Sequence, residues 1–268
     1  MKKSKRLYLW TLTEVFSALS FVGTMINVPM PSGGMVHLGN FVMILAGLLC
    51  GGIVGGLSGS IGMGLYDIFA GYNPSTYLRS FILKFIIGLI VGELFRLIIK
   101  RKINVKVLLF VFSGVFFVLA ILGIIMATKC VDGSFVITIS DATKNIKQSD
   151  LILAIVFAFL FFALLLAAGI LSFKLKYNQQ AALFSTTIAM LANMVLELLL
   201  RTLLTHFLDG FDFSVAYATA LAKIPASILT SFITVFLISF IYLPVHKATK
   251  NYNILNDVEV EEWKSIIS

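Results

Sequence analysis

The chain has 268 residues, of which 59% are hydrophobic and only 13% are charged, and its mean hydropathy is +0.99. Soluble domains carry about 25% charged residues, so this composition excludes an ordinary soluble fold. The net charge of +8 does not indicate nucleic-acid binding, because Lys and Arg occur in short clusters between long apolar runs. That distribution is typical of membrane proteins. We therefore expect an all-α integral membrane protein in the lipid bilayer.

The chain begins with a basic stretch, MKKSKR, followed by an apolar run over residues 7–27 that contains Glu14. This run is too long for the apolar part of a signal peptide, and no A-x-A cleavage site follows it. We therefore expect a retained first membrane span. Pro29, Pro31 and a glycine pair then predict a loop over residues 25–34.

Residues 35–71 form the most distinctive stretch of the chain, because they are apolar and rich in glycine. The stretch is too long for one membrane crossing and about right for two short helices, with a turn at Gly51 and Gly52. Small residues recur every four positions on both sides of this turn, which stacks them on one face of each helix. Another helix can approach such a face closely. That helix belongs either to this pair or to a partner protein.

Five further apolar runs complete eight expected crossings: about residues 77–99, 105–128, 151–173, 181–207 and 214–243. The polar segment 129–150 contains a short alternating piece, SFVITIS, which predicts a small β-hairpin. With eight crossings, the basic clusters all fall on one side of the membrane: residues 2–6, 100–106, 174–176 and 247–250. We therefore expect both termini in the cytoplasm, and the loops 28–36 and 72–78 outside the cell.

Ionisable side chains inside membrane spans are costly, so each is a functional candidate. In the expected topology they gather in the outer half of the membrane: His37, Asp67, Arg79, Arg201 and Lys223, with Lys84 and Glu197 deeper. Glu197 and Arg201 are four residues apart on one helix face, where they can form an ion pair. Two explanations stay open. These residues line a polar pocket open to the outside, or they are interfacial side chains and a structural ion pair.

The sequence contains no recognisable catalytic motif. It contains no HExxH motif, no Walker A motif and no pair of carboxylates at metal-ligand spacing. The piece GSIGMG lacks the lysine of a phosphate-binding loop and lies in an apolar run. We therefore expect no enzyme, no metal and no cofactor, and any ATPase that drives transport would be another chain.

Two stretches carry a family resemblance: GGMVHLGNFVMILAGLLCGGIVGGLSGSIGMGLYDIFAGY and STYLRSFILKFIIGLIVG. They resemble the S components of energy-coupling factor (ECF) transporters, and are most similar to the riboflavin-type branch. The motif residues are His37 to Asn40 and Lys84 to Gly92. A weaker match over residues 190–243 includes AKIPAS, which is similar to the family's I-P-x-N segment, with Ser227 in place of the usual Asn.

The resemblance implies a six-helix membrane protein that binds a vitamin or related micronutrient from outside, with riboflavin as the family default. It also implies partners, a T component and two ATPase subunits, with the first three helices facing the T component. In the family an A-x-x-x-A motif on the first helix serves this contact, and Thr13-x-x-x-Ser17 is a degenerate form of it. The expected partner interface is Ser17, Gly47, Gly51, Gly52, Gly55, Gly56, Gly59 and Gly64.

Residues 103–176 look like two extra helices inserted between the fourth and fifth family helices. The expected divisions are residues 1–102, the insertion 103–176, the last two core helices in 177–250, and a cytoplasmic tail over 251–268. The expected substrate-binding residues are His37, Asn40, Asp67, Arg79, Lys84, Glu197, Arg201 and Lys223.

Two alternatives to a multi-pass S component of the cell membrane remain. One is an autonomous secondary transporter that uses Glu197 or Asp67 for proton coupling. The other is a membrane enzyme that acts on lipid, for which the sequence offers no nucleophile, base or metal set.

Overall fold

The computed structural model describes residues 2–30, 34–128, 134–139 and 142–249. The chain divides into two compact units. The larger unit comprises Met1–Ile103 and Lys176–Ser268, and the smaller unit is Asn104–Leu175. The expected tail over residues 251–268 lies outside the described residues.

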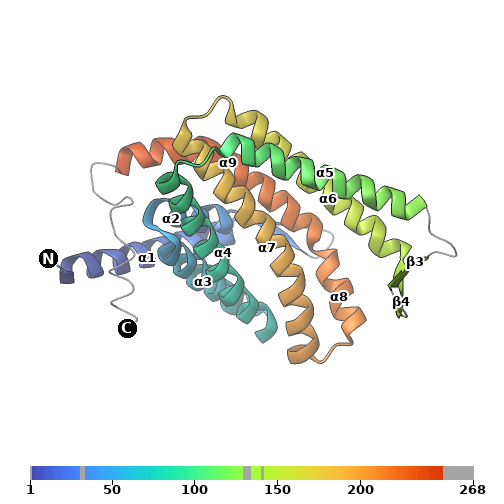
Figure 1. The fold of residues 1–268 in the computed structure, drawn as a ribbon. Helices are drawn as coiled ribbons and strands as arrows, with labels where there is room; N and C mark the ends of the chain where they lie inside the picture. The colour runs from blue at the N-terminus through green and yellow to red at the C-terminus, as the bar shows by residue number, and fades with distance from the viewer. Residues whose placement is uncertain (1, 31–33, 129–133, 140–141, 250–268) are drawn as a thin grey trace. The chain divides into compact units, whose positions relative to one another are not determined.

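The larger unit is a bundle of helices with one small β-hairpin (Figure 1). Its elements are α1 (Lys2–Met25), β1 (Asn27–Pro29), β2 (Met35–His37), α2 (Gly39–Cys50), α3 (Gly52–Phe69), α4 (Pro74–Arg101), α7 (Tyr177–Asp209), α8 (Phe213–Ala222) and α9 (Ile224–Thr249). Helix α3 packs against α1, α2 and α4, and helix α7 packs against α4 and α9. Helix α4 also packs against α2 and so connects α3 and its neighbours to α7.

The smaller unit is a pair of apolar helices joined by a β-hairpin. Its elements are α5 (Val105–Thr128), β3 (Ser134–Ile139), β4 (Ala142–Lys147) and α6 (Gln148–Ser172). Helices α5 and α6 pack through aromatic pairs, among them Phe116 with Phe161 at 5.0 Å between ring centroids. Strands β3 and β4 pair antiparallel, which confirms the hairpin predicted within residues 129–150.

The glycine-rich pair is two short helices, and the predicted turn between them is confirmed. Gly51 joins α2 to α3 with φ +98°, a backbone conformation that favours glycine. A Cβ on Gly55 would collide with the backbone of Gly47 across the pair, and one on Gly88 would collide with the backbone of Gly56. Gly92 stands against Gly52 in the same way. These contacts form a glycine seam, defined here as Gly52 and Gly56 of α3 with Gly88 and Gly92 of α4.

The small residues expected at a partner interface pack within this chain. Ser17, Gly47, Gly52, Gly55, Gly56, Gly59 and Gly64 are all buried within the chain, and Gly51 is half-buried. Gly59 packs on Met43, Gly64 packs on Phe81, and the Ser17 carbonyl stands against Gly62. Of the two explanations for the glycine spacing, packing within the chain is the one observed, and the partner interface stays a prediction.

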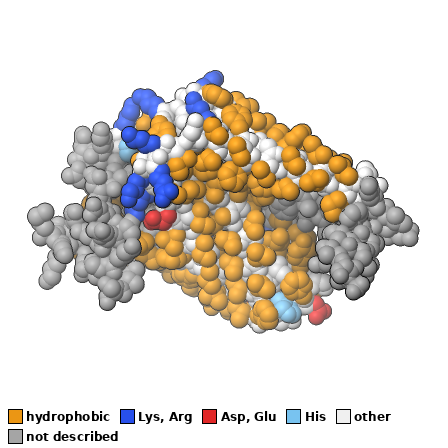
Figure 2. All heavy atoms as spheres, viewed as in Figure 1, with side chains coloured by type: hydrophobic (Ala, Val, Ile, Leu, Met, Phe, Trp, Pro, Cys, Tyr) orange, Lys and Arg blue, Asp and Glu red, His pale blue; other side chains and the backbone are white. Residues whose placement is uncertain are grey.

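The exterior of the larger unit is apolar while its interior holds polar groups. Val195 and Leu199 on α7, with Phe236 and Phe240 on α9, are at least half exposed, whereas Ser185, Thr186 and Thr187 on α7 are fully buried. Figure 2 shows apolar side chains covering much of the visible face. An apolar exterior of this kind suits a lipid solvent.

Three segments of the described chain are long and apolar enough to cross a membrane by length and composition: Val105–Thr128, Tyr177–Asp209 and Phe213–Ala248. Helices α2 and α6 contribute shorter apolar helices, Gly39–Cys50 and Ala158–Ser172. The other predicted crossings stay predictions.

Two segments differ from the sequence expectation. The expected loop over residues 25–34 contributes to a hairpin, because β1 pairs antiparallel with β2 from Asn27 opposite His37 to Pro29 opposite Met35. The last apolar run is broken at Lys223 into α8 and α9. Pro225 explains the break, since proline has no N–H for the preceding turn and fits the first turn of a new helix.

Candidate functional site

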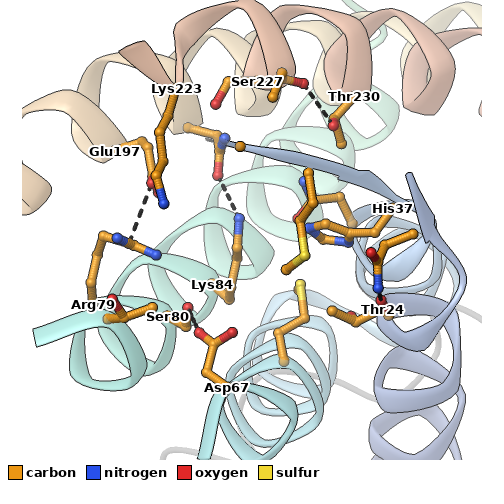
Figure 3. A pocket seen from close by; sticks show the side chains of 18 of the residues that line it. Thr24, His37, Asp67, Arg79, Ser80, Lys84, Glu197, Lys223, Ser227 and Thr230 are labelled. Atoms are coloured by element: carbon orange, nitrogen blue, oxygen red, sulfur yellow. Dashed lines mark hydrogen bonds and ion pairs between the residues drawn. The ribbon is translucent and has the colours of Figure 1, made fainter. Parts of the chain in front are cut away.

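The larger unit contains a cavity of about 300 Å³. It is lined by residues of α1, the β1–β2 hairpin, α2, α3, α4, α7 and the junction of α8 with α9. All eight residues predicted for substrate binding line this one cavity: His37, Asn40, Asp67, Arg79, Lys84, Glu197, Arg201 and Lys223. Side chains as far apart in the sequence as His37 and Lys223 thus meet in one place (Figure 3).

One stripe of helix α7 supplies the acidic centre of the cavity. Asn193, Glu197 and Arg201 are four residues apart and therefore share a helix face. Arg201 donates from Nη2 to Glu197 Oε1 at 2.6 Å and from Nε at 3.1 Å, which confirms the predicted ion pair. Arg79 of α4 adds a second guanidinium, with Nε 3.3 Å from Glu197 Oε1. One carboxylate therefore joins two helices through two arginines.

Helix α4 supplies the deeper polar groups. Lys84 is only 7% exposed, and its Nζ donates to Asn193 Oδ1 at 3.0 Å. Ser80, one turn before Lys84, donates a hydrogen bond to Asp67 Oδ2 of α3. Figure 3 shows Lys84 and Lys223 reaching toward the same space from opposite sides.

Sequence reasoning missed Asn193 and Ser80, because neither is ionisable. Their spacing could have indicated them, because each lies four residues before a charged residue that the sequence analysis selected, and therefore on the same helix face. Asn193 precedes Glu197, and Ser80 precedes Lys84. A search for polar residues on the same helix face as Glu197 and Lys84 would have found both.

The β1–β2 hairpin and the start of α2 contribute neutral polar groups. The Gly39 backbone N–H donates to His37 Nδ1 at 3.2 Å. Burial lowers the pKa of the His37 imidazole well below its ordinary value, and the Lys84 charge lowers it further, so the ring is neutral. The Asn40 side chain is 3% exposed, and within the described chain its Oδ1 is buried without a hydrogen-bond partner.

Lys223 enters the cavity from the break between α8 and α9 (Figure 3). No other described residue forms a hydrogen bond with its ammonium or an ion pair within 4.0 Å of it. Within the described ranges, no three His, Cys, Asp or Glu side chains come together as a metal ion would require. The described lining of the cavity therefore holds more cations than carboxylates, and one carboxylate, Glu197, is shared by two arginines.

A protein-family model described as "ECF-type riboflavin transporter, S component" matches residues 7–165. No curated protein and no solved structure matches the chain. The matched residues include the hairpin, α2, α3 and α4, and they end before α7, which carries Glu197 and Arg201. The match covers more than half of the chain, so the chain belongs to the family of ECF-type riboflavin transporter S components, a family of transporter components and not of enzymes.

Proposed function

We propose that this S component binds a vitamin or related micronutrient in the cavity and takes it up across the cell membrane, with riboflavin as the family default. A T component and two ATPase subunits would supply the energy by ATP hydrolysis. The observation that carries the proposal is that one cavity holds both the family-motif residues and the ionisable residues of α7. His37, Asn40 and Lys84 come from the motifs, and Glu197 and Arg201 come from α7.

The electrostatics of the cavity support a binding site. Taking charged groups out of water is costly, and a protein retains them where they are paired or where they serve a function. Arg79, Lys84 and Arg201 are each less than 10% exposed, in a unit whose exterior is apolar. The Asn40 Oδ1 is a buried acceptor that a ligand donor would satisfy.

The proposed membrane arrangement keeps both termini in the cytoplasm and eight crossings. Six core crossings come from the larger unit, with α8 and α9 counted together, and two come from α5 and α6. The separation of Asn104–Leu175 as a compact unit of its own supports the interpretation of these two helices as an insertion. The cavity, which contains residues of the β1–β2 hairpin, then opens toward the outside.

The test is assembly and transport in one experiment. The tagged chain is expressed with and without a T component and two ATPases, isolated in mild detergent, and placed in liposomes that contain ATP. We expect a stable complex, and uptake of a vitamin that requires ATP and all subunits. Uptake by the chain alone under a proton or ion gradient would contradict the proposal and identify a secondary transporter.

A further inference from the structure

We infer that the substrate carries an oxyanion, a carboxylate or phosphate group, which lies between Lys84 and Lys223. This inference rests on the proposed function in one respect, that the cavity is where the substrate binds. It goes further in naming the chemical class of the substrate and the two side chains that recognise its charge.

The charges of the cavity do not balance. Among the described lining residues, four are cations, namely Arg79, Lys84, Arg201 and Lys223, and two are carboxylates, Asp67 and Glu197. Four minus two leaves an excess of two positive charges. His37 does not add to it, because its Nδ1 accepts a hydrogen bond from a backbone N–H and the ring is therefore not doubly protonated.

The two lysines carry this excess. Glu197 is engaged by both arginines, at 2.6 Å from Arg201 and 3.3 Å from Arg79. Lys84 has a neutral partner, the Asn193 amide oxygen at 3.0 Å. Lys223 has no carboxylate within 4.0 Å in the described part of the chain. Two ammonium groups thus line one cavity, and neither has a carboxylate within 4.0 Å in the described part of the chain.

An anion from the substrate would compensate this excess. Uncompensated charge in a partly dehydrated cavity is unfavourable, and hydrogen bonds between ammonium and carboxylate or phosphate groups are among the strongest that proteins form. The side chains come from different elements, α4 and the α8–α9 junction. An oxyanion would therefore also hold these elements together when the substrate is bound.

The walls of the cavity favour a small polar solute over a fused aromatic ring system. Its volume of about 300 Å³ is at the lower end of the range for ligand pockets. Among the described lining residues, Tyr72 is the only Phe, Tyr or Trp, while large flat rings are usually held by aromatic side chains. The other large apolar side chains are Met30, Met35 and Met63.

The experiment uses the full chain, purified in detergent, and records its unfolding temperature. Potassium acetate, potassium phosphate and riboflavin are each titrated against potassium chloride at constant ionic strength. The variants are Lys84→Met and Lys223→Met, and Lys100→Met is the control, because Lys100 is an exposed residue of α4 outside the cavity. Should Lys84→Met fail to fold, Lys223→Met carries the test alone.

We expect acetate or phosphate to raise the unfolding temperature of the wild type and of Lys100→Met above the chloride value. In Lys223→Met the half-effect concentration rises by about tenfold or more. Without added oxyanion, Lys223→Met is more stable than the wild type, because it removes a surplus charge. An effect of acetate identifies a carboxylate substrate, and an effect of phosphate alone identifies a phosphorylated one.

Three results would overturn the inference: no effect of either oxyanion beyond chloride, an equal effect in Lys223→Met, or stabilisation by riboflavin that is unchanged in both lysine variants. Failure of the chain to assemble with the T component and ATPases is a separate result. It would contradict the proposed function while the anion titration still reports on the two lysines.

Discussion

Helix α4 takes part in two regions that differ in what they tolerate. Its first half carries Arg79, Ser80 and Lys84 into the cavity, and its second half carries Gly88 and Gly92 into the glycine seam. Ser80, Lys84, Gly88 and Gly92 follow one another at four-residue spacing, so a single stripe of one helix serves both regions.

The difference lies in what each region lacks. The seam lacks space, because the α3 and α4 backbones touch where side chains would otherwise stand. The cavity has space, and its described lining has an excess of positive charge. We therefore expect the seam to respond to the size of a side chain and the cavity to respond to its charge and hydrogen bonding. The predictions below test this distinction, in order of decreasing effect.

The largest effect is expected for Gly88→Leu in the seam. A Cβ at this position would overlap the backbone of Gly56, which cannot move aside without shifting α3. We expect loss of folded protein, a destabilisation of more than about 3 kcal/mol. Gly114→Leu is the matched control, because a Cβ on Gly114 meets nothing within 4 Å. Size-exclusion profiles in detergent report the outcome, and equal profiles for both variants would contradict the role of the seam.

The next effect is expected for Glu197→Gln in the cavity. The amide keeps the size of the carboxylate but leaves Arg79 and Arg201 without their shared anion. Breaking a buried ion pair from one side costs about 3 kcal/mol. We expect a lower unfolding temperature, measured without added ligand. Glu93→Gln is the control, because Glu93 pairs with Arg96 on the surface and such pairs contribute little. Equal stability of the two variants would contradict the role of the Glu197 carboxylate in stabilising the cavity.

A smaller effect is expected for Ser80→Ala. The change deletes the hydroxyl that donates to buried Asp67 and leaves the packing of α4 almost unchanged. Loss of such a hydrogen bond costs about 1.5 kcal/mol. Ser75→Ala is the comparison, because Ser75 donates to the half-buried Asp209 at 2.6 Å, where water can replace the lost donor. Urea or thermal unfolding measures both, and a larger loss for Ser75→Ala would reverse the expected order.

The sequence was most informative where a residue is unusual for its surroundings. Charged residues in apolar runs identified Lys84, Glu197 and Lys223 as members of one cavity, although they lie on different helices. Four-residue glycine spacing predicted close packing and the turn at Gly51. The glycine spacing could not predict which helix packs against each row, because any helix can approach a row of glycines closely. That helix is α2 for one row and α4 for the other.

The sequence was least informative where polar groups are common or where tertiary contacts decide. Asn193 and Ser80 are neutral, so nothing in composition separates them from the many buried Ser and Thr residues of α1 and α7. Strands β1 and β2 are three residues each, too short for an alternating pattern. The sequence also did not predict the break at Lys223. A proline in an apolar run can interrupt a helix or stand in the first turn of a new one, and tertiary contacts decide which occurs.

The smallest effect is expected from His37 and concerns pH. Burial lowers the pKa of His37 in the folded protein below its ordinary value of 6.5. Below pH 6.5 the unfolded chain therefore binds a proton that the folded protein does not, and stability falls as the pH decreases. Stability from this residue is fully present only well above pH 6.5, at about pH 8, and about 0.8 kcal/mol of it is lost at pH 6.

His37→Gln keeps a side-chain acceptor for the Gly39 N–H and cannot take up a proton in this range. We expect its unfolding temperature to change less between pH 8 and pH 6 than that of the wild type. His206→Gln is the control, because His206 contacts the Phe211 carbonyl at the end of α7, outside the cavity. The same pH dependence in His37→Gln and in the wild type would contradict this prediction. It would mean that water reaches the His37 ring in the folded protein, and that the cavity is more hydrated beside β2 than beside Lys84.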